Sequence, residues 1–165
     1  MFAVACGQKR GEVKMTSGNA ARAIVMAGLA CGVLDITAAL VVYGSMGLKP
    51  LRLLQGIAAG VLGPKSFQGG IGTALLGLAL HFVIAFGAAS VYFAASRGMR
   101  VLVEQAPLFG ALYGVVVYFF MNRIVVPLSG AVKYPFSAKM MVIGVVIHIF
   151  CVGLPIALSI RRFAT

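Results

Sequence analysis

Charged side chains are scarce in this sequence. Only 10% of the 165 residues are charged, and only three of them, Glu12, Asp35 and Glu104, are acidic, whereas soluble domains are about 25% charged. Apolar residues make up 61% of the chain, and its mean hydropathy is +1.04. This composition excludes a water-soluble globule. It also excludes a disordered chain, which combines low hydrophobicity with high charge.

Cysteine is rare as well, and its three copies are isolated from one another. Cys6, Cys31 and Cys151 form no C-x-x-C pair and suggest no disulfide framework. Cys31 and Cys151 fall within apolar runs, where a thiol behaves as a small hydrophobe. Ser129 lies outside any G-x-S-x-G sequence. We therefore predict no catalytic residue and no enzymatic activity.

Basic residues outnumber acidic ones and give the chain a formal net charge of +11. Many of them flank long apolar runs: Lys9, Arg10, Lys14 and Arg22 before the first run, Arg97 and Arg100 after the second, and Arg161 and Arg162 after the fourth. Such flanking cations lie at anionic lipid headgroups. Because a basic helical face with interleaved aromatics is missing, we expect the lipid bilayer as a partner and no nucleic acid.

The apolar residues are grouped into four runs, each long enough to cross a bilayer. A hydrocarbon core of about 30 Å needs about 20 apolar residues in helical form, and a helix satisfies its own backbone groups. The expected spans are residues 23–46, 70–96, 106–126 and 140–160. The sequence thus predicts an all-α, integral membrane four-helix bundle, formed by a single domain over residues 23–162.

The segments outside the spans set the expected orientation. Residues 1–22 form an N-terminal extension, in which Met15 is a second candidate for the translation start besides Met1. A basic cluster before the first span usually dominates orientation, so we expect both termini in the cytoplasm. Residues 51–64 are apolar but too short to cross, which predicts an interfacial or re-entrant segment between the first two spans. This segment could cap the bundle or act as a gate.

Every span carries polar residues on a face of small residues. At a spacing of roughly three to four residues, Asp35, His81, Asn122 and His148 fall in line with glycines and alanines. Small faces are where membrane helices approach closely. The glycines expected at these helix contacts are Gly28, Gly32, Gly77, Gly110, Gly114 and Gly144. We therefore expect the four polar side chains to point into the bundle, and Arg123 either to reach outward or to turn in and pair with Asp35.

These polar residues allow several uses. An Asp at the centre of a membrane helix costs about 2.5–3.5 kcal/mol on insertion scales, so it usually has a partner and often a role. The leading functional hypothesis is handling of protons or of a small solute by Asp35, His81 and His148, with Arg123 at the mouth. One alternative is a structural or assembly subunit, in which an Asp35–histidine hydrogen bond only fixes packing. Another is a b-type haem held by His81 and His148. We otherwise expect no cofactor and, without a close-spaced ligand pair, no metal site.

The polar residues stand within short motifs: Leu34-Asp35-Ile36, Leu54-Gln55-Gly56-Ile57-Ala58 with Gly60, Leu80-His81-Phe82, Met121-Asn122 with Pro127-Leu128-Ser129, and His148 with Gly153-Leu154-Pro155. Together they resemble a family of short bacterial inner-membrane proteins of unknown function, over approximately residues 21–162. The resemblance implies a four-helix protein of the bacterial cytoplasmic membrane and carries no activity. Because the chain offers little polar surface, we also expect a homo-oligomer or a subunit of a larger membrane complex.

Overall fold

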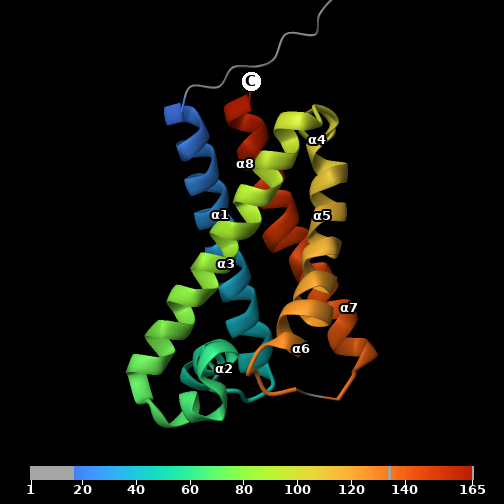
Figure 1. Ribbon diagram of the computed structural model, residues 1–165. Coiled ribbons are helices and arrows are strands. Elements are labelled where there is room, and N and C mark those ends of the chain that lie inside the picture. The colour runs from blue at the N-terminus through green and yellow to red at the C-terminus, as the bar shows by residue number, and fades with distance from the viewer. Residues whose placement is uncertain (1–16, 134, 165) are drawn as a thin grey trace, which may run out of the picture.

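The structure is a computed structural model that describes residues 17–133 and 135–164 (Figure 1). Every regular element within these residues is a helix. The expected all-α fold is thereby confirmed. Cys6, the cations that precede Arg22 and the choice between Met1 and Met15 lie outside the described residues.

Four helical stretches are long and apolar enough to cross a membrane: Gly18–Ser45, Gly70–Gly98, Ala106–Leu128 and Ala138–Phe163. The first two correspond to the uninterrupted helices α1 (Ser17–Ser45) and α3 (Gly70–Gly98). A short helix, α4 (Val101–Glu104), leads from α3 into the third span. The chain is thus a multi-pass membrane protein whose helices form the expected bundle.

The third and fourth spans each contain a π-helical segment. The third span consists of α5 (Ala106–Phe120), the π segment η2 (Met121–Val125) and α6 (Val126–Leu128). The fourth consists of α7 (Ala138–Ile147), the π segment η3 (His148–Gly153) and α8 (Leu154–Ala164).

Prolines account for both π segments. Proline lacks an N–H, and its ring collides with the carbonyl four residues earlier in a regular α-helix. For Pro127 and Pro155 these carbonyls belong to Arg123 and Cys151, which lie inside η2 and η3. The helices widen there instead of ending. The third span, expected to end at residue 126, therefore continues through Pro127 to Leu128.

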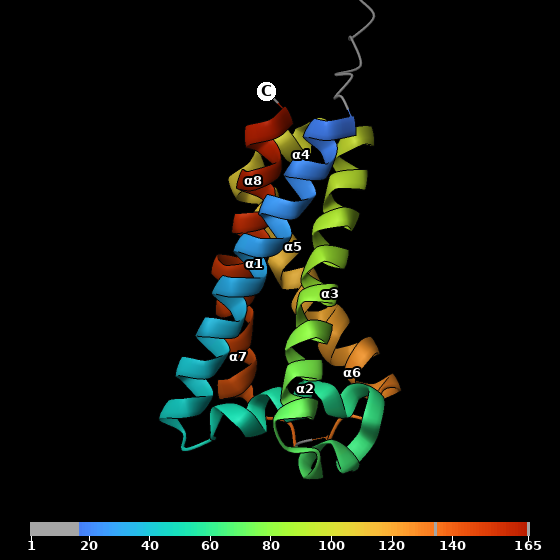
Figure 2. The same ribbon diagram turned by 90° about the vertical axis from the view of Figure 1, so that its left-hand side faces the viewer.

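The bundle is narrow at one end and wide at the other. Both views show α1, α3, α5 and α8 close together at the end where the described chain begins and ends (Figures 1 and 2). The helices diverge toward the opposite end, where α2 (Pro50–Leu62) and the 3₁₀ helix η1 (Gly63–Gln68) lie across the opening.

Small side chains close the narrow end. Its buried core consists of Ala27, Cys31, Ala85, Ala89, Tyr92, Leu102, Ala106, Val152, Ile156, Ala157 and Ile160. The Tyr92 hydroxyl donates to the Leu102 carbonyl at 2.9 Å, and the Tyr113 hydroxyl donates to the Ala88 carbonyl at 2.8 Å. Alanines let the helix backbones come close, which replaces the hydrophobic driving force that lipid removes.

The glycines of the third and fourth spans meet neighbouring backbone or rings. A methyl group at Gly114 would collide with the His148 carbonyl, and one at Gly110 would press on Ala157 and Gly153. Gly144 faces the Tyr118 ring. The third and fourth spans therefore cross at the closest approach that glycine allows.

The glycines of α1 and α3 make different contacts. Gly28 and Gly32 of α1 receive the rings of Phe86 and Phe82, so aromatic side chains and not a second backbone fill this face. Gly77 of α3 lies directly against the Leu54 carbonyl of α2. Its partner is therefore the short helix and not another span.

Helix α2 forms within the segment that we expected to be interfacial or re-entrant. It begins at Pro50, where a missing N–H is harmless in the first turn, and it ends at Gly63, whose φ of 62° suits glycine. The buried Gln55 amide donates to the Gly70 carbonyl at 3.0 Å, and the Gly130 N–H donates to the Gly60 carbonyl at 2.9 Å. The short helix is thereby held to the start of the second span and to the bend that follows the third.

Candidate functional site

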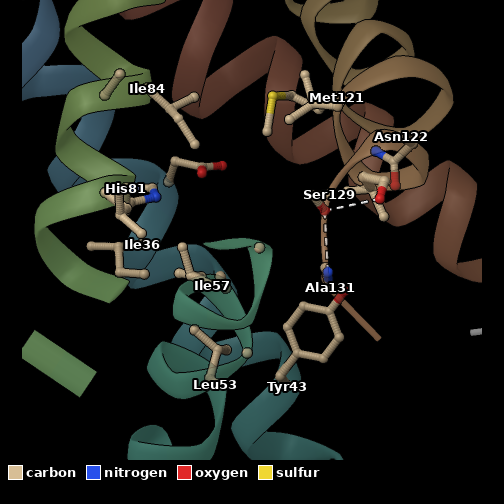
Figure 3. Close-up of a pocket in the computed structure, with 18 of the residues that line it drawn as sticks. Ile36, Tyr43, Leu53, Ile57, His81, Ile84, Met121, Asn122, Ser129 and Ala131 are labelled. Atoms are coloured by element: carbon tan, nitrogen blue, oxygen red, sulfur yellow. Dashed lines mark hydrogen bonds between the residues drawn. The ribbon is translucent and has the colours of Figure 1, made fainter. Parts of the chain in front are cut away.

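A cavity of about 940 Å³ lies between the spans at the wide end of the bundle. Figure 3 shows His81 and Ile84 of α3 and Leu53 and Ile57 of α2 on one side of it, across from Met121, Asn122 and Ser129. Most of its lining residues are apolar. A volume within about 300–1,000 Å³, apolar walls and a few polar groups are typical of small-molecule sites.

The structure brings together four of the five polar residues singled out in the sequence. Asp35 of α1, His81 of α3, Asn122 of η2 and His148 of η3 all line this cavity. Arg123 is exposed and is not among the lining residues. Successive residues of a helix point in different directions, so Arg123 takes the outward position of the two expected for it and does not pair with Asp35.

The carboxylate of Asp35 has no hydrogen bond and no ion pair within the described residues. The hydrogen bond between Asp35 and a histidine, expected in the packing alternative, does not form. The physical reason is that both imidazoles donate to backbone carbonyls instead.

His81 links two spans. Its Nε2 lies 2.9 Å from the Gly32 carbonyl oxygen of α1. A carbonyl only accepts, so Nε2 carries the hydrogen, and in the neutral ring Nδ1 keeps its lone pair. The Phe82 ring stands edge-on to the imidazole, with centroids 5.6 Å apart. His81 therefore fixes α3 against α1 and leaves one acceptor nitrogen unused.

His148 and Asn122 both donate back into their own helices. The His148 Nδ1 donates to the Gly144 carbonyl, and the Asn122 Nδ2 donates to the Tyr118 carbonyl, each at 2.9 Å. Each residue lies at the start of a π segment, where the widened helix disturbs the regular backbone pairing. The donations occupy carbonyls there and leave the His148 Nε2 lone pair and the Asn122 Oδ1 as acceptors, together with the second N–H of the Asn122 amide as a donor.

The ring nitrogens that stay free bear on the haem alternative. Each imidazole would have to direct one nitrogen at the iron, but the Nε2 of His81 is engaged by the Gly32 carbonyl. Only its Nδ1, the nitrogen nearer the main chain, is left. Within the described residues, no three His, Cys, Asp or Glu side chains are grouped to share a metal ion.

Arg52 lines the cavity as well, although we did not expect it there. Its guanidinium lies 5.5 Å from the centroid of the Phe67 ring and donates to the Phe67 carbonyl at 3.4 Å. A signal was present in the sequence, because Arg52, Gly56 and Gly60 recur every four residues and so share one face of a helix. Once residues 51–64 are treated as a helix, that face is a candidate cavity wall.

Comparisons with protein-family models, with curated proteins and with solved structures find no match to this chain. The structure itself defines the class, a multi-pass membrane protein with a large internal cavity.

Proposed function

We propose that this protein takes up protons or a small solute in its cavity, and that Asp35 is the group that binds them. The observation that carries the proposal is an acidic side chain that lines a cavity of about 940 Å³ and has no partner. A chain that needed Asp35 only for packing would be expected to pair it, because an unpaired acid within a membrane costs several kcal/mol.

The walls support binding of a solute and not merely of water. Ile36, Leu53, Ile57 and Ile84 are among the apolar residues that line the cavity. Helix α2 lies across its wide end and is held at Gln55 and Gly60, so it is placed to control access. His81 and His148 each retain a lone pair, and neutral histidine can accept a proton near physiological pH.

Proton flux in proteoliposomes tests the proposal. Wild-type protein should dissipate an imposed pH gradient faster than protein-free vesicles, as reported by an entrapped pH-sensitive dye. Asp35→Asn keeps the side-chain shape and removes the charge, so the rate should fall to that of empty vesicles. Glu104→Gln makes the same change at an exposed acid outside the cavity and should retain the wild-type rate. Equal rates for folded wild-type protein, Asp35→Asn and empty vesicles would refute proton uptake through Asp35.

A structural or assembly role is the second candidate, and the bond from His81 to Gly32 favours it because this bond fastens α3 to α1. The two candidates differ for Asp35→Asn. If Asp35 serves packing, the variant should elute as aggregate or lose helix content; if it serves binding, the variant should remain monodisperse and helical. Gel filtration with circular dichroism separates these outcomes.

We further propose a location in the bacterial inner membrane, with both termini in the cytoplasm and α2 on the outer side. Arg22 near the start of α1, Arg97 near the end of α3 and Arg161 near the end of α8 lie toward the same end of the bundle. Cations concentrate on the cytoplasmic side of membrane proteins. Self-association, or attachment to a larger complex, would cover part of the exposed apolar surface.

A further inference from the structure

The histidines that line the cavity leave hydrogen-bond acceptors, and no donors, available to a ligand. Among its histidines and its asparagine, a ring or amide N–H of each is already donated to a carbonyl: His81 to Gly32, His148 to Gly144, and Asn122 to Tyr118. What remains on the two neutral imidazoles is a lone pair, on His81 Nδ1 and on His148 Nε2. The histidines therefore offer acceptors to a ligand and no donor.

The other polar side chains that line the cavity add one N–H donor, the second amide hydrogen of Asn122, and several acceptors. The carboxylate of Asp35 offers oxygen acceptors. The Ser129 hydroxyl donates to the Val126 carbonyl at 2.9 Å and accepts from the Ala131 N–H at 3.2 Å, so its donor is used. Tyr43 also has an interaction partner of its own.

Arg52 is the one permanent cation among the lining residues, and it is placed apart from Asp35. Its guanidinium is turned onto the Phe67 ring and carbonyl. Asp35 lies ten residues before Ser45, the end of α1, which at 1.5 Å per residue is roughly 15 Å from the end that α2 covers. The acid is therefore in the inner part of the cavity, and the arginine is on the helix that covers it.

We propose that the cavity binds a protonated organic amine with an apolar body. This inference rests on the proposed function and names its solute class. The ammonium group is expected at Asp35, which supplies the opposite charge, and its N–H donors match acceptors on His81 and His148. The apolar part fits walls formed by residues such as Ile36, Ile57, Ile84 and Val152. The carboxylate of Asp35 favours a cationic solute over an anionic one, and the two imidazole lone pairs favour a solute that carries N–H donors.

Four probes that share a phenethyl body isolate the features of this ligand. Phenethylammonium carries charge and N–H donors, phenethyltrimethylammonium carries charge alone, phenethyl alcohol is neutral, and 3-phenylpropionate is an anion. Isothermal titration calorimetry on the full chain in lipid nanodiscs should show the tightest binding for phenethylammonium. Charge-assisted hydrogen bonds predict an affinity about tenfold or more above those of the other three probes.

Three variants locate the binding. Asp35→Asn should weaken phenethylammonium binding by about tenfold to a hundredfold, and Glu104→Gln should leave it unchanged. Ile84→Trp adds bulk to the wall without altering any charged group, so it should abolish binding even if Asp35→Asn fails to fold.

The outcomes separate this inference from the function on which it rests. Equal affinity for phenethyl alcohol or for phenethyltrimethylammonium would overturn the donor-cation ligand, as would tighter binding of 3-phenylpropionate. If phenethylammonium does not bind while Asp35-dependent proton flux persists, the inference is wrong and the proposed function stands. If binding and flux are both absent, both are wrong.

Discussion

Asp35 is the residue on which the proposed function of this chain depends. The acid lies within α1, lines the cavity and has no hydrogen bond or ion pair in the described part of the chain. His81, His148 and Asn122 differ from it because each also holds a carbonyl of the bundle. Among these four residues, only Asp35 forms no hydrogen bond within the described part of the chain.

This difference predicts the sign of a stability change. Asp35→Leu should raise the free energy of unfolding by about 1–3 kcal/mol, because it removes the cost of an unpaired acid within the membrane and breaks no bond. Denaturation by sodium dodecyl sulfate in mixed micelles, followed by circular dichroism, measures the change. Glu104→Leu, at an exposed acid in α4, should leave the stability nearly unchanged. A less stable Asp35→Leu would show that the acid has a packing role.

At the scale of the element, α2 depends on one glycine of α3. The Leu54 carbonyl of α2 approaches Gly77 so closely that no side chain fits there. Gly87, on the same helix, has nothing within 4 Å of the position where a side chain would begin. The two glycines therefore form a matched pair for testing how α2 is docked.

Gly77→Val should push α2 away from α3 and destabilise the protein by about 1–3 kcal/mol, the usual cost of overpacking against a rigid neighbour. Trypsin reads out the displacement, because Arg52 and Lys65 lie in α2 and η1. Cleavage at these two sites should be faster in Gly77→Val than in the wild type, and unchanged in Gly87→Val. Resistance of Gly77→Val to trypsin would contradict close docking of α2.

Hydropathy was sufficient to predict the helical elements but not their internal form. Each span is a run of apolar residues long enough, as a helix, to cross the bilayer. Inside the bilayer a single segment can satisfy its own backbone hydrogen bonds only as a helix, so the apolar composition of the run is enough to predict its secondary structure. The π segments at Met121 and His148 could not be predicted in this way. A proline such as Pro127 can end, kink or widen a helix, and the packing around it selects the outcome.

At the scale of the whole molecule, the difference between the narrow and the wide end produces the cavity. Small faces correctly predicted that Asp35, His81, Asn122 and His148 face a common interior. The small faces did not predict a cavity. The glycine face of α1 contacts the Phe82 and Phe86 rings instead of the backbone of a second helix. The size of the rings and the tilt of the helices determine the distance between the spans, and the spacing of small residues along the sequence specifies neither.

The same asymmetry makes the orientation testable with two matched glutamines. Gln68 is exposed on η1 at the wide end, and Gln105 is exposed beside α4 at the other end. In a chain whose Cys6, Cys31 and Cys151 are replaced by Ser, Gln68→Cys should react with a membrane-impermeant maleimide on intact bacterial cells. Gln105→Cys should react only after the cells are lysed, because the basic cluster before the first span is expected to keep this end of the bundle in the cytoplasm. The reverse pattern would place α2 and the wide end of the cavity inside the cell, so that a solute would enter from the cytoplasm.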